Sequence, residues 1–498
     1  FSLDFTDNRI GYHNLAAGLN PQPPSSGENK WGMIGYLGRV NYNINGKYLI
    51  TLNLRVDGSS RFGEDSKYGT FPSAAFAWNI NEESFMSSDQ FFDQLKLRLS
   101  YGVIGNSDIP SYQSLSTVGP NGEGTFDNTE PYVGVGPLRL ANPMLRWERT
   151  STFNTGLDMA IFDTRLMLTT DFYIQNTSDL LVNSPIPTTT GFSYFYNNIA
   201  SLRNMGIELA IDGVILNKGA FNWNATFNIS ANKNEITELP GGVDIPVPGV
   251  LLVPSGWSII REGEPLGTFF GYQADGIFQT DEEAQNSPLL IGQEAVAGER
   301  RYLDINGYDE NGELTGEPDG VVNSADRKIL GQAQPKIIWN LINNFEFKGI
   351  DLSFFIQAAH GNNIVNAYDF ELSTLTGETN VYRDAYFNRW TPDNPSNEYR
   401  KIDPSDRNVF SSAQVEDGSF IRIKNVTLGY SFPQRLLEKI KLTRLRLYVA
   451  TNNIYTFTDY SGYDPEINAF GQNSLLLGID YGGYPLSQTY LAGIQIGI

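Results

Sequence analysis

Apolar and polar side chains alternate along most of this chain in runs of about 10 to 13 residues. Segment 48–57, for example, places Ile50 and Leu52 on one face and Thr51 on the other. A period of two is that of a β-strand, because successive side chains of a strand point to opposite sides of the sheet. About thirteen such strands can be recognised within residues 34–498. The pattern therefore predicts an all-β protein with strands longer than the usual five or six residues.

The links between these strands are short and long in strict turn. The short links lie near residues 45–47, 81–93, 162–164, 214–220, 348–349 and 433–442. The long polar links lie near residues 58–71, 104–145, 177–199, 232–334, 359–418 and 454–486. A transmembrane antiparallel β-barrel has this asymmetry, because its periplasmic turns are tight and its extracellular loops are large. Residues 232–334 would then form the largest extracellular loop region.

Two of the short links test the assignment of faces. The apolar faces on either side of the first short link coincide only if the turn holds an odd number of residues, and Asn45, Gly46 and Lys47 supply three. Gly46 suits the left-handed or bulge position of such a turn. Across the link 348–349 the apolar faces coincide only with an even number, and this link has two residues. The lengths of both turns agree with the predicted faces.

The second face of each predicted strand carries charges and amides, which suits a wet lumen better than a dry core. The residues expected to line the lumen include Arg39, Arg55, Arg98, Glu148, Asp158 and Glu208. Unpaired backbone groups are costly in lipid, so such strands must close into a ring. Aromatic residues near strand ends are candidates for interfacial girdles: Tyr42, Tyr48, Trp78, Trp223, Tyr430 and Phe432. A soluble propeller or stacked sandwich also alternates, but strand length, link asymmetry and the charged second face favour the barrel.

Composition narrows the function classes. The 498 residues carry a formal net charge of −21 and include no cysteine. This excludes a disulfide scaffold and thiolate chemistry, and the acidic balance argues against nucleic acid, which needs clustered Lys and Arg. No run of about 18 apolar residues occurs, so no transmembrane helix is expected.

No Gly/Ser-rich or Pro-rich linker divides the chain, and we interpret residues 1–498 as one barrel portion. The first residues, 1–5, read as the second half of a strand, and no signal peptide opens the sequence. We therefore expect the sequence to begin within a fold. The last strand alternates up to Ile498, as in proteins that assemble into an outer membrane, although an aromatic last residue is common there.

The longest link contains an acidic motif that is typical of calcium loops. Asp304-Ile305-Asn306-Gly307 and the run 319–326 together resemble an EF-hand loop, D-x-N followed by D-G-x-V-x-x-x-D. The predicted ligands of a structural Ca²⁺ are Asp304, Asn306, Asp319, Val321 through its carbonyl, Asn323 and Asp326. Residues 307–318 are inserted where one residue normally stands. The alternative is a solvated acidic loop with Asx turns.

Aromatic side chains in the long links are weak candidates for substrate binding, because an aromatic face stacks on sugars and on peptide side chains alike. The candidates are Tyr194, Tyr196, Phe270, Tyr382, Tyr386 and Tyr460. Loop packing and docking of a partner lid are the alternatives. No catalytic residue is assigned, since His13 and His360 are the only histidines and no hydrolase or nucleotide-binding motif occurs. A carboxylate pair for glycoside hydrolysis cannot be read without knowing distances.

Several short segments, spread over the chain, carry a family signature. They are DGSSRFG (57–63), KYGTFPS (67–73), LKLRLSYG (95–102), TSDLL (177–181), NRWTP (388–392), VEDGSF (415–420) and NVTLGY (425–430). The chain resembles the SusC/RagA family of TonB-dependent outer-membrane transporters of Bacteroidota. The resemblance implies that the chain is the C-terminal part of a 22-stranded barrel, about 14 strands of it, without the N-terminal plug domain.

The same resemblance implies function and partners. It implies import of an oligomeric nutrient, a glycan or a peptide, across the outer membrane. It implies a SusD-like surface lipoprotein as a lid, the TonB–ExbB–ExbD complex acting through the plug, lipids and lipopolysaccharide around the wall, a dimer of transporter–lipoprotein pairs, and no required cofactor. The alternatives are a passive outer-membrane pore and a surface adhesion or structural barrel.

Overall fold

A computed structural model of the chain describes residues 2–5, 18–21, 28–87, 91–124, 132–192, 194–247, 256–373, 380–402, 409–471, 473 and 475–498. Its main element is a 13-stranded sheet in the order β26-β24-β23-β20-β19-β12-β11-β10-β9-β6-β5-β4-β3. The strands of this sheet are β3 (Met33–Ile44), β4 (Tyr48–Ser59), β5 (Tyr68–Asn79), β6 (Phe92–Asn106), β9 (Glu148–Ile161), β10 (Leu166–Pro185), β11 (Tyr194–Lys218), β12 (Phe221–Glu238), β19 (Ile337–Phe347), β20 (Ile350–His360), β23 (Phe420–Ser431), β24 (Arg444–Thr458) and β26 (Thr489–Gly497). From β5 to β26, every neighbouring pair is antiparallel.

The chain folds as two compact units. The first comprises Phe1–Tyr36, Val56–Gly69 and Ser107–Arg146, and the second comprises Leu37–Arg55, Thr70–Asn106 and Trp147–Ile498. In the first unit, β1 (Ser2–Phe5) pairs with β2 (Gly18–Pro21), and β7 (Val118–Gly124) pairs with β8 (Tyr132–Pro137). Residues 2–5 are thus a strand, as the sequence predicts, but they pair in a two-stranded sheet and not in the large one. His13 lies outside the described residues.

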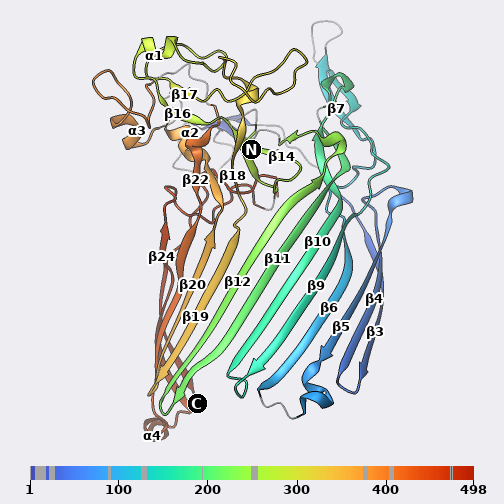
Figure 1. Ribbon diagram of the computed structural model, residues 1–498, viewed down its shortest axis with the longest axis vertical. Helices are drawn as coiled ribbons and strands as arrows, with labels where there is room; N and C mark the ends of the chain where they lie inside the picture. The colour runs from blue at the N-terminus through green and yellow to red at the C-terminus, as the bar shows by residue number, and fades with distance from the viewer. Residues whose placement is uncertain are drawn as a thin grey trace. The chain divides into compact units, whose positions relative to one another are not determined.

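The short turns of the second unit have the predicted lengths. Strand β3 ends at Ile44 and β4 begins at Tyr48, with Asn45 and Gly46 at φ 52° and 74°. In the turn between β19 and β20, Lys348 and Gly349 have φ 49° and 88°, and two left-handed residues are what a type I′ hairpin requires. The short turns of this unit meet at one end of its strands, and the folded parts of its links 232–334, 359–418 and 454–486 lie at the other (Figure 1).

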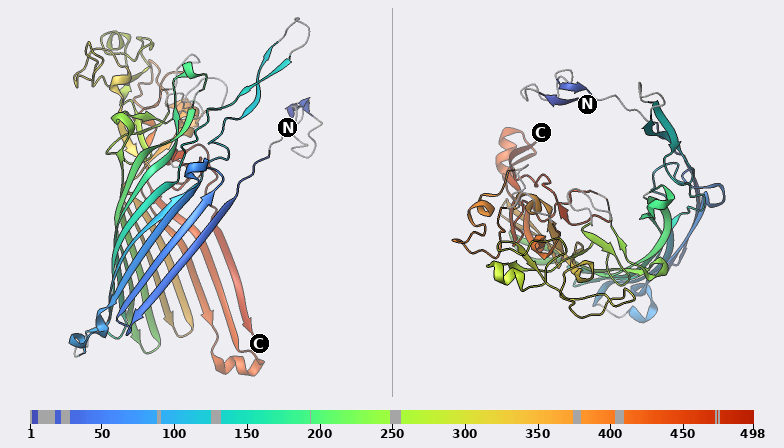
Figure 2. Two further views of the ribbon diagram at one scale, coloured as in Figure 1. Left: turned by 90° about the vertical axis from the view of Figure 1, so that its right-hand side faces the viewer. Right: turned by 90° about the horizontal axis from the view of Figure 1, so that it is seen from above.

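The two faces of the large sheet differ as the alternation predicts. One face carries large apolar side chains that the described chain does not cover; Leu54, Phe172, Val449 and Ile494, for example, are 51%, 42%, 52% and 64% exposed. The opposite face is polar, and side chains on it are hydrogen-bonded across β3–β4, β4–β5, β6–β9–β10 and β20–β24. Figure 2 shows these strands running side by side along the sheet.

The long links contain their own short elements. Small sheets join β13 (Ile245–Pro246), β14 (Ser258–Ile260), β15 (Thr268–Gly271) and β18 (Lys328–Gln332); β16 (Ala274–Ile277) and β17 (Arg300–Tyr302); and β22 (Val415–Asp417), β21 (Asn363–Asn366) and β25 (Ile479–Asp480). The α-helices are α1 (Asp281–Gln285), α2 (Ala367–Leu372), α3 (Arg383–Phe387) and α4 (Gln434–Leu437). The 3₁₀ helices are η3 (Glu64–Ser66), η4 (Ile80–Glu82), η5 (Ser84–Met86), η6 (Thr188–Thr190), η7 (Pro240–Gly242), η8 (Ser324–Asp326), η9 (Ser412–Gln414) and η10 (Glu438–Ile440). Among the described residues, none of the helices has the length and apolar character needed to cross a membrane.

Candidate functional site: the polar face and the folded links

An arginine on β6 links three neighbouring strands across the polar face. Arg98 donates from Nε to Asp158 on β9 at 2.9 Å, and from Nη1 and Nη2 to both carboxylate oxygens of Asp171 on β10 at 2.9 and 2.8 Å. The guanidinium crosses β9 above Gly156. In the strand register, Gly156 is paired with Arg98 on one side and with Asp171 on the other. A Cβ at Gly156 would lie 2.5 Å from Arg98 Nη2. Glycine is therefore the residue that lets this bidentate pair form across the middle strand.

The same arrangement recurs elsewhere on the polar face. Arg446 on β24 donates from Nε to Asp351 on β20 at 2.9 Å, and a Cβ at Gly429, on the strand between them, would lie 2.5 Å from each side chain. On the same polar face, the Tyr173 hydroxyl crosses above Gly206 of β11 and donates to Asn232 on β12 at 3.1 Å. Three glycines thus carry polar bridges over a middle strand, and these bridges hold the polar side chains of the wall in fixed positions.

The residues predicted for the lumen lie on this same face. Glu208 stands opposite Asp171 in the β10–β11 register, and Glu148 accepts from Asn106 Nδ2 at 3.4 Å. Arg39 donates to Asn41 at 3.2 Å. The structure brings Arg98 and Asp158 together directly, and it distributes Arg39, Arg55, Glu148 and Glu208 along the wall.

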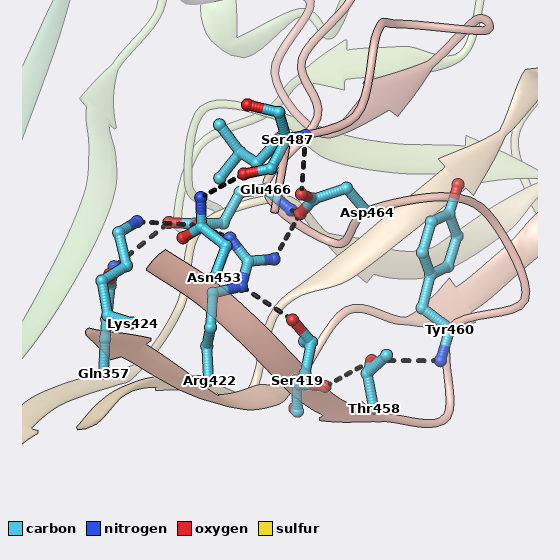
Figure 3. Close-up of polar contacts among 12 residues, drawn as sticks. Gln357, Ser419, Arg422, Lys424, Asn453, Thr458, Tyr460, Asp464, Glu466 and Ser487 are labelled. Carbon is cyan, nitrogen blue, oxygen red and sulfur yellow. Dashed lines mark hydrogen bonds and ion pairs between the residues drawn. The ribbon is translucent and has the colours of Figure 1, made fainter. Parts of the chain in front are cut away.

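A buried arginine fastens the last long link to the wall. The side chain of Arg422 on β23 is only 2% exposed. It donates to Asp464 Oδ1 at 2.5 Å and to Thr456 Oγ1 at 2.8 Å, and it also pairs with Glu466. Figure 3 shows this network, in which Gln357 on β20 donates to Glu466 at 3.1 Å.

The carboxylate of Asp464 in turn organises its own link. Its Oδ1 accepts the main-chain N–H of Glu466 at 3.0 Å, and its Oδ2 accepts that of Leu486 at 3.3 Å. Two ends of the link 459–488 are therefore held by one carboxylate, which is itself held by Arg422. We call Arg422, Asp464 and Glu466 the Arg422 clamp. Because the side chains of Arg422 and Asp464 are both buried, removing the arginine leaves the Asp464 carboxylate without its compensating charge.

Several of the long links of the second unit pack together around one apolar core. Trp257 is 1% exposed, and its ring centroid lies 5.0 Å from that of Phe410 and 5.3 Å from that of Phe370. The buried members of this core are Val182, Ala200, Leu202, Ile236, Leu239, Val247, Trp257, Ile260, Leu266, Phe269, Val365, Ala367, Phe370, Phe410, Leu476 and Ile479. Since several links contribute, they form one folded body, which we call the roof.

The surroundings of one carboxyl group within the roof raise its pKa. The pKa of Asp369, on α2, is raised to about 6, mainly by burial; the nearby Glu416 carboxylate also raises this pKa, and Arg300 opposes the shift. Glu416 accepts from the Asn366 amide at 2.9 Å, and Asn366 Oδ1 caps α2 by accepting the Asp369 N–H at 2.9 Å. The roof therefore contains a carboxyl group that titrates above the ordinary aspartate range.

The structure brings the two halves of the predicted calcium motif together. The N–H groups of Asp319 and Gly320 donate to Asp304 at 3.2 and 2.7 Å. Asp326 is fully buried and accepts three main-chain N–H groups, from Ile305, Asn306 and Asn323, at 2.7 to 3.0 Å. In the part of the chain that the structure describes, no group of three or more His, Cys, Asp or Glu is arranged to hold a metal. A cation at this loop stays a prediction.

Comparison with known proteins identifies the family to which this fold belongs. The family model "TonB dependent receptor-like, beta-barrel" matches residues 1–316. TonB-dependent receptor P3 of Formosa agariphila is 36% identical over 99% of this chain and 48% of its own length. The chain belongs to the TonB-dependent receptor β-barrel family. TonB-dependent receptor SusC of Bacteroides thetaiotaomicron is 31% identical over 93% of this receptor chain and 43% of its own length.

A solved structure agrees with the sequence relatives. The structure of the RagAB peptide transporter has a TM-score of 0.77 and 26% identity, covering 97% of this receptor chain and 50% of that chain. The receptor chain therefore spans about half the length of the relatives that it matches. The predicted SusC/RagA resemblance, the membrane β-barrel fold class and the outer-membrane location are confirmed. The exposed apolar face of the sheet is the surface that meets lipid.

The six aromatic candidates of the receptor have different surroundings. Tyr194 and Tyr386 are 42% and 44% exposed. Tyr460 is buried, and its hydroxyl donates to Asp480 at 2.7 Å. The guanidinium groups of Arg261 and Arg327 lie over the ring of Phe270, 4.8 and 4.9 Å from its centroid, so this ring is used in packing. Tyr196 and Tyr382 are half-buried.

Sequence reasoning missed the Arg422 clamp and the partners Asp171, Asp351 and Arg446. A signal was present: Arg422 alternates with Ile421 and Ile423, and so it belongs to the polar face. Its partners, however, lie 42 and 44 positions along the chain. Only the fold of the last long link brings them to the arginine.

Proposed function

We propose that this chain forms part of an outer-membrane transporter that imports an oligomeric nutrient, a glycan or a peptide, in a TonB-dependent way. The observation that carries the proposal is the contrast between the two faces of the large sheet. One is apolar and exposed, and the other is lined by paired charges such as Arg98 with Asp158 and Asp171. Such a wall encloses an aqueous path through a membrane.

The chemistry of the wall suits hydroxyl-rich or amide-rich cargo. Paired guanidinium and carboxylate groups still have lone pairs and N–H groups free for weak hydrogen bonds to the cargo. Because the charges in these bridges are paired, they do not bind the cargo so strongly that it is trapped. The exposed rings of Tyr194, at the start of β11, and Tyr386, on α3, supply apolar surface for stacking. Both features fit a sugar chain and a peptide chain.

The relatives support active import and a lipoprotein partner. A solved relative is described as a peptide transporter, RagAB, and another relative is SusC. On this basis we assign to the intact protein a SusD-like surface lipoprotein that covers the roof, and energy input through TonB. The passive pore and the adhesion barrel remain the competing functions, and neither requires energy input or a lid.

An uptake experiment separates these functions. Cells that depend on the intact receptor are given fluorescent oligosaccharides or oligopeptides, with and without a protonophore that collapses the proton gradient. Active import predicts accumulation that the protonophore and loss of TonB both abolish. Uptake that survives both treatments would establish the passive pore, and an unchanged uptake after deletion of the receptor would favour adhesion.

A binding experiment tests the role of the roof aromatics. With the cargo class known, Tyr194→Ala and Tyr386→Ala are expected to raise KM or Kd several-fold, since stacking on an exposed ring is lost. Tyr460→Phe is the matched control, because its ring is buried and only its bond to Asp480 is removed. Equal affinities for all variants would exclude these two residues from the binding surface.

A further inference from the structure

The turn between β23 and β24 differs from the other short turns of the sheet. Residues 432–443 form α4 and η10, and the structure places α4 at the end of the sheet opposite the roof (Figure 1). Leu437 is 3% exposed and anchors the turn, whereas Leu436 and Ile440 are 50% and 56% exposed. Two large apolar side chains four residues apart thus point away from the protein.

The same turn is strongly basic in an acidic chain. Residues 433–444 contain the cations Arg435, Lys439, Lys441 and Arg444 and the single acid Glu438, a local net charge of +3, against −21 for the whole chain. All four cations are exposed. Among the ion pairs of the described residues, none involves these four side chains.

An apolar groove adjoins this turn on the lipid-facing side of the sheet. Its volume is about 880 Å³, and its lining includes Ile350, Leu428, Tyr430, Leu447, Val449 and Ile494. Tyr430 packs edge-on against Phe432, with ring centroids 5.0 Å apart. Aromatic pairs at a strand end mark the interface between headgroups and hydrocarbon. The groove therefore begins at the headgroup level and runs into the bilayer.

We propose that the β23–β24 turn and this groove bind an anionic phospholipid of the periplasmic leaflet. The cations Arg435, Lys439 and Lys441 meet the headgroup phosphate, Leu436 and Ile440 enter the acyl-chain boundary, and one acyl chain lies in the groove. Exposed cations interleaved with apolar side chains are the pattern of an interfacial membrane anchor. An acidic protein partner would use the cations but would leave the lipid-facing groove unexplained.

The test uses the intact receptor in detergent micelles, titrated with dioleoylphosphatidylglycerol or with zwitterionic dioleoylphosphatidylcholine, and native mass spectrometry as the readout of bound lipid. Each cation near an anionic surface changes affinity by about fivefold, the equivalent of about 1 kcal/mol. Lys439→Gln/Lys441→Gln is therefore expected to weaken phosphatidylglycerol binding roughly 10- to 30-fold and to leave phosphatidylcholine binding nearly unchanged.

Two further variants make the result specific. Arg149→Gln/Lys328→Gln removes two exposed cations at the long-link end and should leave the preference for phosphatidylglycerol intact. Leu436→Ser/Ile440→Ser should weaken both lipids, because it removes apolar contact and no charge. The proposal is overturned if the unaltered receptor binds both lipids equally, or if the turn variant and the control variant lose the preference alike. It is also overturned if the turn variant keeps the preference for phosphatidylglycerol.

Discussion

Replacing Arg422 with glutamine removes the cation of the Arg422 clamp and leaves Asp464 buried without its partner. The Arg422 side chain is 2% exposed and that of Asp464 is 6% exposed, so solvent screens their interaction little. Breaking a buried pair by removing one partner costs about 3 to 5 kcal/mol. Because the clamp joins the link 459–488 to the wall, we expect this cost to appear as easier local opening of the link and not as loss of the large sheet.

Hydrogen exchange on the intact receptor measures that opening. The N–H groups of Glu466 and Leu486 donate to Asp464, and their protection reports directly on the clamp. A loss of about 3 to 5 kcal/mol corresponds to exchange that is roughly 100- to 4,000-fold faster, up to the rate of an open chain. Arg446→Gln is the matched control, since it breaks a pair on the wall with Asp351 and leaves the link alone.

The comparison of these two variants decides the matter. The reasoning is refuted if Arg422→Gln changes exchange within 459–488 by less than about threefold, a difference too small for a buried pair. It is equally refuted if Arg446→Gln opens the link as much. An intermediate result in Asp464→Asn is expected, because the amide still accepts from the guanidinium while the charge is lost.

Three other perturbations follow from the structure. Gly156→Ala would place a Cβ 2.5 Å from Arg98 Nη2, so the free energy of unfolding of the intact receptor, measured by thermal unfolding, should fall by about 1 to 3 kcal/mol. Gly38→Ala is the control, because a Cβ there would meet nothing within 4 Å, and it should leave this free energy unchanged. Equal behaviour of the two variants would contradict the proposed role of Gly156 in the Arg98 bridge. The folded pKa of Asp369, about 6, lies above its ordinary 3.8, so its proton stabilises the roof fully below about pH 4 and this stability is lost as the pH rises through about 6. Asp369→Asn should abolish that decline in stability, about 3 kcal/mol at most, which protease resistance of the roof measured between about pH 4 and pH 7 reports. Calorimetry with Ca²⁺ should give binding heat that Asp319→Ala removes, and no heat in the unaltered protein would end the calcium prediction.

The pattern of single residues determined much of this fold. Alternation with period two specified the strands and their faces, since a strand has no other way to place successive side chains. Turn lengths at 45–47 and 348–349 followed from the same parity. The candidates of the long links were harder to judge: Tyr194 and Tyr460 look alike in sequence, and only their burial separates them.

The sequence by itself therefore determined which side chains meet lipid and which meet water, because that choice is made residue by residue along each strand. The tertiary structure alone decided which charges become partners. Arg98 meets Asp171 because a glycine-containing strand lies between theirs, and Arg422 meets Asp464 because a distant link returns to the wall. Such pairings depend on register and on the packing of the roof, and neither is written in the spacing of the residues concerned.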